Sequence, residues 1–136
     1  MPHSWKPETY PSVSPYLVVR GAESVVEFLQ ATFGAATLTR YDHSDGSIMH
    51  TELRIDDSVV MIGSAGAGHE PVPSHVHIYV ADVDAVYRRA LQAGGSMVQA
   101  PDRQGADPDR RAGVRDPGGV TWWLATRVAP QPPTPA

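Results

Sequence analysis

Histidine and glutamate residues spaced two positions apart are the residues of this sequence whose types and spacing could support chemistry. His75 and His77 form one pair, and His50 and Glu52 form a second. Residues i and i+2 of a β-strand lie on the same face, so each pair would present two polar groups side by side. Imidazoles and a carboxylate are suitable ligands for Zn, Ni, Mn or Fe(II). The competing interpretation is that these histidines donate hydrogen bonds to a bound molecule or stack on it.

Glu52 also allows chemistry without a metal. A carboxylate beside a histidine could act as a general base on a carbon acid, provided that apolar neighbours such as Met61 and Trp123 raise its pKa. The competing interpretation is a carboxylate neutralised by Arg54, two residues along, because buried charges are usually paired. The sequence leaves both interpretations open.

Three aromatic residues have the strand parity of these polar groups, namely Tyr16, Tyr79 and Trp123. Tyrosine and tryptophan offer flat apolar surfaces with a polar tip, which suits the wall of a small-molecule site. Packing in the core is the competing account for each of them. A binding site for an aromatic or amphipathic molecule is therefore one hypothesis for the function.

An internal repeat predicts the elements that position these residues. The segment YLVVRGAESVVEFLQATFG at 16–34 aligns with HIYVADVDAVYRRALQAGG at 77–95, and both have the pattern of a strand, a turn and a helix. The helices are expected over about 22–33 and 83–93. Two βαβββ units, with helices that cover a sheet, predict an α+β fold. Further strands are expected over about 36–41, 47–55, 58–63, 96–100, 111–115 and 120–126.

Strand alternation predicts which side chains face the core. A tight turn at residues 56–57 would place Glu52 opposite Met61. The strand residues expected to pack against the helices are Leu53, Ile55, Val60, Ile62, Val76, Ile78, Val80, Trp122 and Leu124. Those expected on the opposite face are Tyr16, His50, Glu52, Arg54, Val59, Met61, His75, His77, Tyr79, Thr121 and Trp123.

Apolar residues at helical spacing predict the buried faces of the two helices. Asp82 is expected to cap the second helix, since a side-chain oxygen at this position accepts from a free backbone N–H. The residues expected to face the core are Ala22, Val25, Val26, Leu29 and Phe33 in the first helix and Val83, Val86, Ala90 and Leu91 in the second.

Proline-rich ends and a Gly/Pro linker divide the chain. Proline interrupts helices and central strands, so residues 1–12 and 128–136 are expected to be tails. The first module is expected over 13–64 and the second over 75–127, joined by the linker 65–74. Residues 102–116 alternate arginine with aspartate and are expected to be mostly a solvated loop.

Composition limits the partners. The 136 residues include 11 Lys+Arg and 15 Asp+Glu, which gives a net charge of −4, and there is no run of basic residues. Nucleic acid is therefore not expected as a partner. No apolar stretch is long enough to span a membrane, and the start lacks the pattern of a signal peptide, so a cytoplasmic location is expected. The absence of cysteine excludes thiol chemistry.

Four segments in order resemble the vicinal oxygen chelate superfamily, which includes glyoxalase I, bleomycin-resistance proteins and extradiol dioxygenases, and in particular its PhnB-like branch. They are ESVVEFL before FG, DGSIMHTELRIDDSVVMI at 45–62, VADVDAVYRRALQAGG at 80–95 and DPGGVTWWL at 116–124. The resemblance implies a cup-shaped mixed sheet that holds a small ligand, with the helices on the outer face. It also implies a homodimer, in which module one of one subunit completes a cup with module two of the other.

The same resemblance implies where metal ligands would stand. The superfamily draws a ligand from the first and fourth strand of each module, and the matching positions here are Ser14, Met61, His75 and Trp123. Only His75 is a good ligand type. The standard His/Glu metal site is therefore expected to be absent, and glyoxalase I chemistry has no evident Lewis acid.

Two classes of function follow. The first is a metal-free protein that binds a small aromatic or amphipathic metabolite or antibiotic, with a ligand-binding set of Tyr16, Met61, His75, His77, Tyr79 and Trp123. The alternative is an enzyme. It would be a lyase, isomerase or dioxygenase with a rearranged metal site of His50, Glu52, His75 and His77, or a metal-free catalyst of proton transfer that uses Glu52 and His50.

Overall fold

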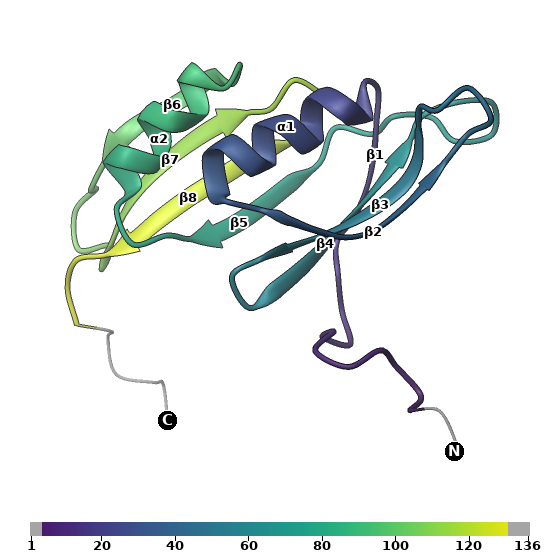
Figure 1. Cartoon of the computed structure of the whole chain (residues 1–136). Coiled ribbons are helices and arrows are strands. Elements are labelled where there is room, and N and C mark those ends of the chain that lie inside the picture. The colour runs from purple at the N-terminus through teal and green to yellow at the C-terminus, as the bar shows by residue number, and fades with distance from the viewer. Residues whose placement is uncertain (1–3, 131–136) are drawn as a thin grey trace.

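The chain folds as two consecutive βαβββ modules, which confirms the predicted fold class (Figure 1). The computed structural model describes residues 4–130. Asp102, Asp109 and Arg110 lie in the stretch predicted as a loop but belong to strands, since Asp102 pairs with Arg111, Asp109 with Arg127 and Arg110 with Thr126. Module one contains β1 (Tyr16–Val19), α1 (Ala22–Phe33), β2 (Ala36–Asp42), β3 (Ile48–Ile55) and β4 (Ser58–Ser64). Module two contains β5 (His75–Tyr79), α2 (Val83–Gln92), β6 (Ser96–Asp102), β7 (Asp109–Arg115) and β8 (Thr121–Arg127).

The two modules form separate four-stranded sheets with the same topology. Sheet one has the order β1-β4-β3-β2 and sheet two has the order β5-β8-β7-β6. In each sheet the first strand pairs in parallel with the fourth, and the other pairs are antiparallel. The internal repeat in the sequence is thus a repeat of topology. Neither helix within residues 4–130 is long and apolar enough to cross a membrane.

The β3–β4 hairpin has the predicted register. Ile55 pairs with Ser58 and Glu52 pairs with Met61 across the two-residue turn. Asp56 in that turn has a φ of 52°, in the left-handed region that a tight hairpin turn requires. The apolar side chains of the hairpin that were expected to face the core, Leu53, Ile55, Val60 and Ile62, are all buried.

Helix α1 packs against both modules. The Phe33 ring lies 5.2 Å from the ring of Trp122 in β8, and a Cβ at Gly118 would meet Val25 at 2.5 Å. Phe28 is buried although it lies outside the predicted apolar stripe, because a helix wedged between two modules buries more than one face. Helix α2 begins as predicted, with the Asp82 side chain accepting from the Ala85 N–H at 3.1 Å.

Four predicted orientations need correction or refinement. Leu91 was expected to face the core, but 38% of its surface is exposed, since α2 packs mainly through Val83, Val86 and Ala90. Val59 and Thr121 were expected on the open sides of β4 and β8, and both are buried. The Pro15 carbonyl accepts from the Met61 N–H and holds the chain before β1 against β4. The core side of β5 is only half-buried, as expected of an edge strand.

A buried turn sets the direction of the two tryptophans in β8. Asp116 precedes the turn into β8, and its carboxylate accepts from the N–H groups of Gly118 and Val120 and from Trp122 Nε1 at 2.9 Å. Burial raises the pKa of Asp116 despite these hydrogen bonds. Because Trp122 is fixed in the core, the next residue, Trp123, must point to the opposite side of sheet two.

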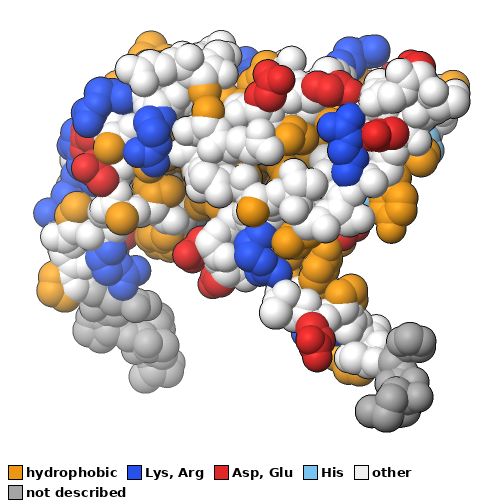
Figure 2. Space-filling view, in the orientation of Figure 1, with side chains coloured by type: hydrophobic (Ala, Val, Ile, Leu, Met, Phe, Trp, Pro, Cys, Tyr) orange, Lys and Arg blue, Asp and Glu red, His pale blue; other side chains and the backbone are white. Residues whose placement is uncertain are grey.

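Each sheet therefore has one face toward the helices and one face away from them, which we call its open face. In Figure 1 the helices lie above the sheets, and the chain before β1 descends on the other side. The surface in Figure 2 carries apolar side chains interspersed with charged ones. The residues predicted to do chemistry lie on the two open faces.

Candidate functional site

On the open face of sheet one, Glu52 is held by two hydrogen-bond donors, a tyrosine and a histidine. Tyr10 Oη donates to Glu52 Oε1 at 2.6 Å, and His50 Nε2 donates to Glu52 Oε2 at 2.8 Å. His50 and Glu52 stand two residues apart on β3, so strand geometry brings them together, as predicted. Tyr10 reaches them from the segment before β1. This segment was expected to be a tail, and its proline-rich sequence gives no periodic signal of the contact.

The hydrogen bonds keep Glu52 ionised. Burial acts to raise the pKa of Glu52, but the hydrogen bonds from Tyr10 and His50 outweigh it, and the pKa lies below its ordinary value of 4.5. The same contact raises the pKa of Tyr10 to about 12. The hypothesis of a raised pKa at Glu52 is therefore wrong. The predicted partner Arg54 is wrong as well, since its Nη2 donates to the carbonyl and hydroxyl oxygens of Thr9.

Tyr16 forms an aromatic platform on sheet one. Its ring stacks on the His50 ring with centroids 5.5 Å apart and planes inclined by 24°. The ring lies over Gly63 in β4, where a Cβ would come within 2.5 Å of Tyr16 Oη. Although it is supported from below, 55% of the Tyr16 surface is exposed. A glycine on the neighbouring strand thus lets an exposed aromatic ring lie close to the sheet.

Trp123 forms the matching platform on sheet two. Its Nε1 donates to His75 Nδ1 at 3.0 Å, and the two rings are stacked with centroids 6.2 Å apart. The Trp123 ring lies over Gly113 in β7, where a Cβ would come within 2.7 Å of Trp123 Cζ3. An aromatic ring, an imidazole and a supporting glycine therefore occur together on both open faces.

His77 is fixed by a cation. A guanidinium can only donate, so Arg111 Nη1, at 3.0 Å, must donate to His77 Nε2, and the His77 proton resides on Nδ1. Partial burial and the charge of Arg111 lower the pKa of His77, which favours this neutral form. The Tyr79 ring meets the His77 ring edge to face at 4.9 Å. His77 and Tyr79 are side by side, as their spacing predicted.

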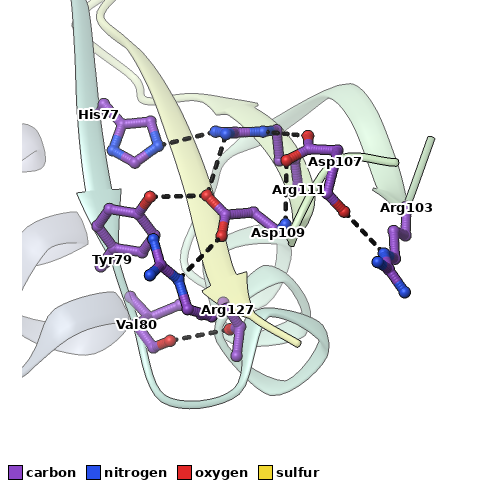
Figure 3. Close-up of polar contacts among 9 residues, drawn as sticks. His77, Tyr79, Val80, Arg103, Asp107, Asp109, Arg111 and Arg127 are labelled. Atoms are coloured by element: carbon purple, nitrogen blue, oxygen red, sulfur yellow. Dashed lines mark hydrogen bonds and ion pairs between the residues drawn. The ribbon is translucent and has the colours of Figure 1, made fainter. Parts of the chain in front are cut away.

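Below His77 lies a network of paired charges that sequence reasoning missed (Figure 3). Asp109, with 1% of its side chain exposed, accepts from Tyr79 Oη at 2.7 Å and from Arg111 Nη2 at 3.0 Å through Oδ2. Its Oδ1 lies 3.7 Å from Arg127 Nε. Arg111 Nε also donates to Asp107 at 2.7 Å. Asp107, Asp109 and Arg111 lie in a stretch of alternating Arg and Asp, a pattern typical of exposed loops.

The donor set does not fit the superfamily's metal site. The four matching positions carry a hydroxyl, a thioether, an imidazole and an indole, and the indole of Trp123 occupies the Nδ1 lone pair of His75. Arg111 occupies the Nε2 lone pair of His77 in the same way. Among residues 4–130, no group of three or more His, Cys, Asp or Glu side chains is placed to hold a metal ion. His50 and Glu52 lie on sheet one, whereas His75 and His77 lie on sheet two.

Two cavities flank the His50–Glu52 pair on sheet one. One, of about 360 Å³, is lined by Glu52 and Met61 together with the N-terminal residues Trp5, Lys6 and Tyr10. The other, of about 410 Å³, is lined by Tyr16, His50 and the linker after β4. Met61 thus lies at the predicted place, beside Glu52. Ser14, the first of the four superfamily ligand positions, lines the smaller cavity.

The fold and the site define a class of protein: two βαβββ modules whose open faces carry aromatic platforms. A model of the Glyoxalase/Bleomycin resistance protein/Dioxygenase superfamily matches residues 12–124. The chain belongs to this superfamily, as the sequence resemblance predicted. The more specific assignment to the PhnB-like branch stays a prediction.

Known proteins similar to the chain agree with this assignment. An uncharacterized protein of Mycobacterium bovis is 36% identical over 129 residues, which cover 87% of this chain and 84% of the relative. The crystal structure of TioX from Micromonospora sp. ML1 is similar with a TM-score of 0.67 and 24% identity, covering 90% of this chain and all of that one. TnmS3 from Streptomyces sp. CB03234, described as an antibiotic binding protein, has a TM-score of 0.63 and 19% identity, covering 86% of this chain and 97% of that one. These two structures share the fold.

Proposed function

We propose that the protein binds a small aromatic or amphipathic molecule between the aromatic platforms of its open faces, without a divalent metal. The observation that carries this proposal is the repeated arrangement of a ring, an imidazole and a glycine in both modules. Tyr16 lies on His50 and over Gly63, and Trp123 lies on His75 and over Gly113. An aromatic ring that lies over a glycine of the neighbouring strand offers a stacking surface for another flat ring.

A second copy of the chain is the proposed other wall of the cup. Tyr16 and Tyr79 each expose 55% of their surface, and sheet one and sheet two are not hydrogen-bonded to each other within the chain. Exposed apolar groups of this size favour an interface or a ligand site. Sheet one of one subunit facing sheet two of another would cover both platforms. Sedimentation equilibrium should therefore give about twice the chain mass of 14.6 kDa, and a monomer at all concentrations would contradict the dimer.

The test of binding is quenching of tryptophan fluorescence by a panel of two-ring and three-ring aromatic compounds. Trp123→Ala should abolish the quenching, because it removes one platform. Leu91→Ala is the control, since Leu91 is an exposed apolar residue on helix α2, away from both open faces, and it should leave the quenching intact. His75→Ala should change the affinity only a few-fold.

Two results would overturn the proposal. Quenching that persists in Trp123→Ala would place the ligand elsewhere. No quenching by any compound of the panel would remove the aromatic platforms as a binding site. A large loss of affinity with His75→Ala alone would instead indicate that the imidazole, and not the indole, is the main contact.

A proton-transfer enzyme is the second candidate, and the hydrogen bond between His50 and Glu52 favours it. An ionised carboxylate that accepts from His50 Nε2 leaves Nδ1 as the nitrogen able to take a proton from a substrate. The carboxylate would then orient the imidazole. In D₂O, a ligand with an acidic C–H should exchange hydrogen for deuterium in the wild type. Glu52→Gln should bind the ligand but slow the exchange at least tenfold, and unchanged exchange would exclude this role.

A further inference from the structure

We propose that Glu52 receives a cationic group of the ligand, such as a protonated amine, and that Tyr10 occupies this position in the free protein. The inference rests on the proposed binding function and adds the charge of the ligand to it. It is carried by the partners of Glu52, by the cavities around it and by the way the N-terminal segment is attached.

Among residues 4–130, the basic side chain in contact with Glu52 is His50, and no lysine or arginine pairs with Glu52. Its side chain is only 17% exposed, and both oxygens accept from groups that need carry no charge, the Tyr10 phenol and the His50 imidazole. Arg54, two residues along the strand, donates to Thr9 instead. A mostly buried carboxylate that no lysine or arginine neutralises leaves a negative potential, which favours a cation in front of it.

Sheet two shows the contrast within the same chain. Its buried carboxylate, Asp109, is paired with both Arg111 and Arg127. Arg111 in turn donates through three nitrogens, to His77, Asp107 and Asp109. The charges on sheet two therefore compensate each other, and sheet two offers no free guanidinium from Arg111 to neutralise Glu52.

The surroundings of Glu52 suit an organic cation and not only a bare ion. Glu52 lines a cavity of about 360 Å³, and its partner His50 lines a cavity of about 410 Å³. The rings of Tyr16 and Tyr41 flank His50, with centroids 5.5 Å and 6.1 Å from it. Aromatic faces beside a carboxylate attract ammonium groups through the ring quadrupole as well as the charge. The platform can hold the ring of a ligand while Glu52 holds its amine.

Tyr10 is attached in a way that allows it to leave. Besides its bond to Glu52, the segment is held at this point by Arg54, which donates to Thr9. Thr9 has a φ of 64°, in the left-handed region that costs a β-branched residue energy, so its release relieves strain. Pro15 keeps its hydrogen bond from the Met61 N–H and retains the base of the segment on β4. The Tyr10 hydroxyl thus supplies the donor that a ligand N–H would supply.

Calorimetric titration with three matched probes tests the inference on the full chain. The probes are 2-naphthylmethylammonium, 2-naphthylmethanol and 2-naphthoate, which share one ring system and differ in charge. The cation should bind at least tenfold more tightly than the alcohol, and the anion more weakly than the alcohol. Glu52→Gln should abolish the preference for the cation and leave the alcohol within threefold.

Two further variants sharpen the test. Asp42→Asn removes the same charge from an exposed site on the same sheet, where Asp42 pairs with Arg40, and it should preserve the preference. Tyr10→Phe removes the competing donor, so it should tighten binding of the cation severalfold. Circular dichroism melting curves establish that each variant is folded at the temperature of titration.

The outcomes separate this inference from the proposed function. Equal binding of all three probes, lost in Trp123→Ala, would overturn the cation site and leave the aromatic cup intact. Binding of no probe would overturn both. A preference for the cation that survives Glu52→Gln would move the charge recognition to another residue, and weaker binding by Tyr10→Phe would make Tyr10 a ligand contact instead of a competitor.

Discussion

Sheet one and sheet two have the same strand order, yet their open faces hold carboxylates in different ways. On sheet one, Glu52 is held by a tyrosine from a segment outside the sheet and by a histidine. On sheet two, Asp109 is buried beneath two arginines and a tyrosine, all of them on the strands of that sheet. Both faces still carry an aromatic ring over a glycine.

The difference shows how a duplicated scaffold can divide its tasks. Charges that neutralise each other within one sheet stabilise that sheet and fix its side chains. A charge held by a detachable segment can change partners when a ligand arrives. We therefore expect sheet two to contribute more to stability and sheet one to contribute more to the selection of the ligand. Four predictions test this division, beginning with the largest effect.

Asp109→Ala should destabilise the protein by about 3 kcal/mol, because removal of one partner leaves Arg111 and Arg127 without their shared carboxylate. Glu52→Ala should cost clearly less, since its partners carry no obligatory charge. Urea unfolding followed by circular dichroism measures both. Equal losses of unfolding free energy in the two variants would contradict the view that sheet two contributes more to stability than sheet one.

Gly113→Ala should move the Trp123 ring, because the new Cβ would lie 2.7 Å from Cζ3. Overpacking of this kind costs about 1 to 2 kcal/mol, and displacement of the ring should weaken aromatic ligands by about tenfold. Gly95→Ala is the control, since its Cβ would meet Val114 and Phe28 in the core, so it should cost stability without moving the Trp123 ring. Unchanged binding by Gly113→Ala would show that the platform does not depend on the glycine.

Acid should affect sheet two before sheet one. In the folded protein the pKa of His77 lies below its ordinary value of 6.5. As the pH falls, the unfolded chain therefore takes up a proton at His77 at a higher pH than the folded chain does. The free energy of unfolding consequently falls as the pH drops through about 6.5. The folded pKa of Glu52 lies below 4.5, so its contribution is present above that pH and is lost as the pH falls through the lower folded value. His77→Gln should flatten the curve of unfolding free energy between pH 7 and 5, and Glu52→Gln only below about 4.5. An effect of Glu52→Gln between pH 7 and 5, with His77→Gln acting only below about 4.5, would contradict this prediction.

The smallest effect is expected at an exposed ion pair. Arg110 donates from Nε and Nη2 to Asp84 at 2.9 Å, but both side chains are more than a third exposed. Arg110→Ala should therefore leave the midpoint of urea unfolding almost unchanged, and salt should reduce any loss further. A loss as large as that of Asp109→Ala would show that pairing, and not burial, sets the stability of sheet two.

Much of the fold could be predicted from alternation and repetition, because these patterns report local geometry. The parity of residues 75–79 fixed which side chains share a face, and the turn at residues 56–57 fixed the register of Glu52 and Met61. Contacts that join distant segments left no such signal. Tyr10 sits in proline-rich sequence without a period, and Asp109 sits among alternating charges that are typical of exposed loops. Their roles depend on tertiary packing.

The central claim is that the aromatic platforms bind a ligand without a metal. Its most direct test is the affinity for 2-naphthylmethylammonium, measured with and without divalent ions. The protein is stripped with a chelator and titrated by calorimetry, then titrated again with Zn, Ni, Mn or, without oxygen, Fe(II). The account predicts the same dissociation constant within about twofold in every case. The account would be contradicted if one ion lowered the dissociation constant at least tenfold in the wild type but not in the His75→Ala, His77→Ala double variant.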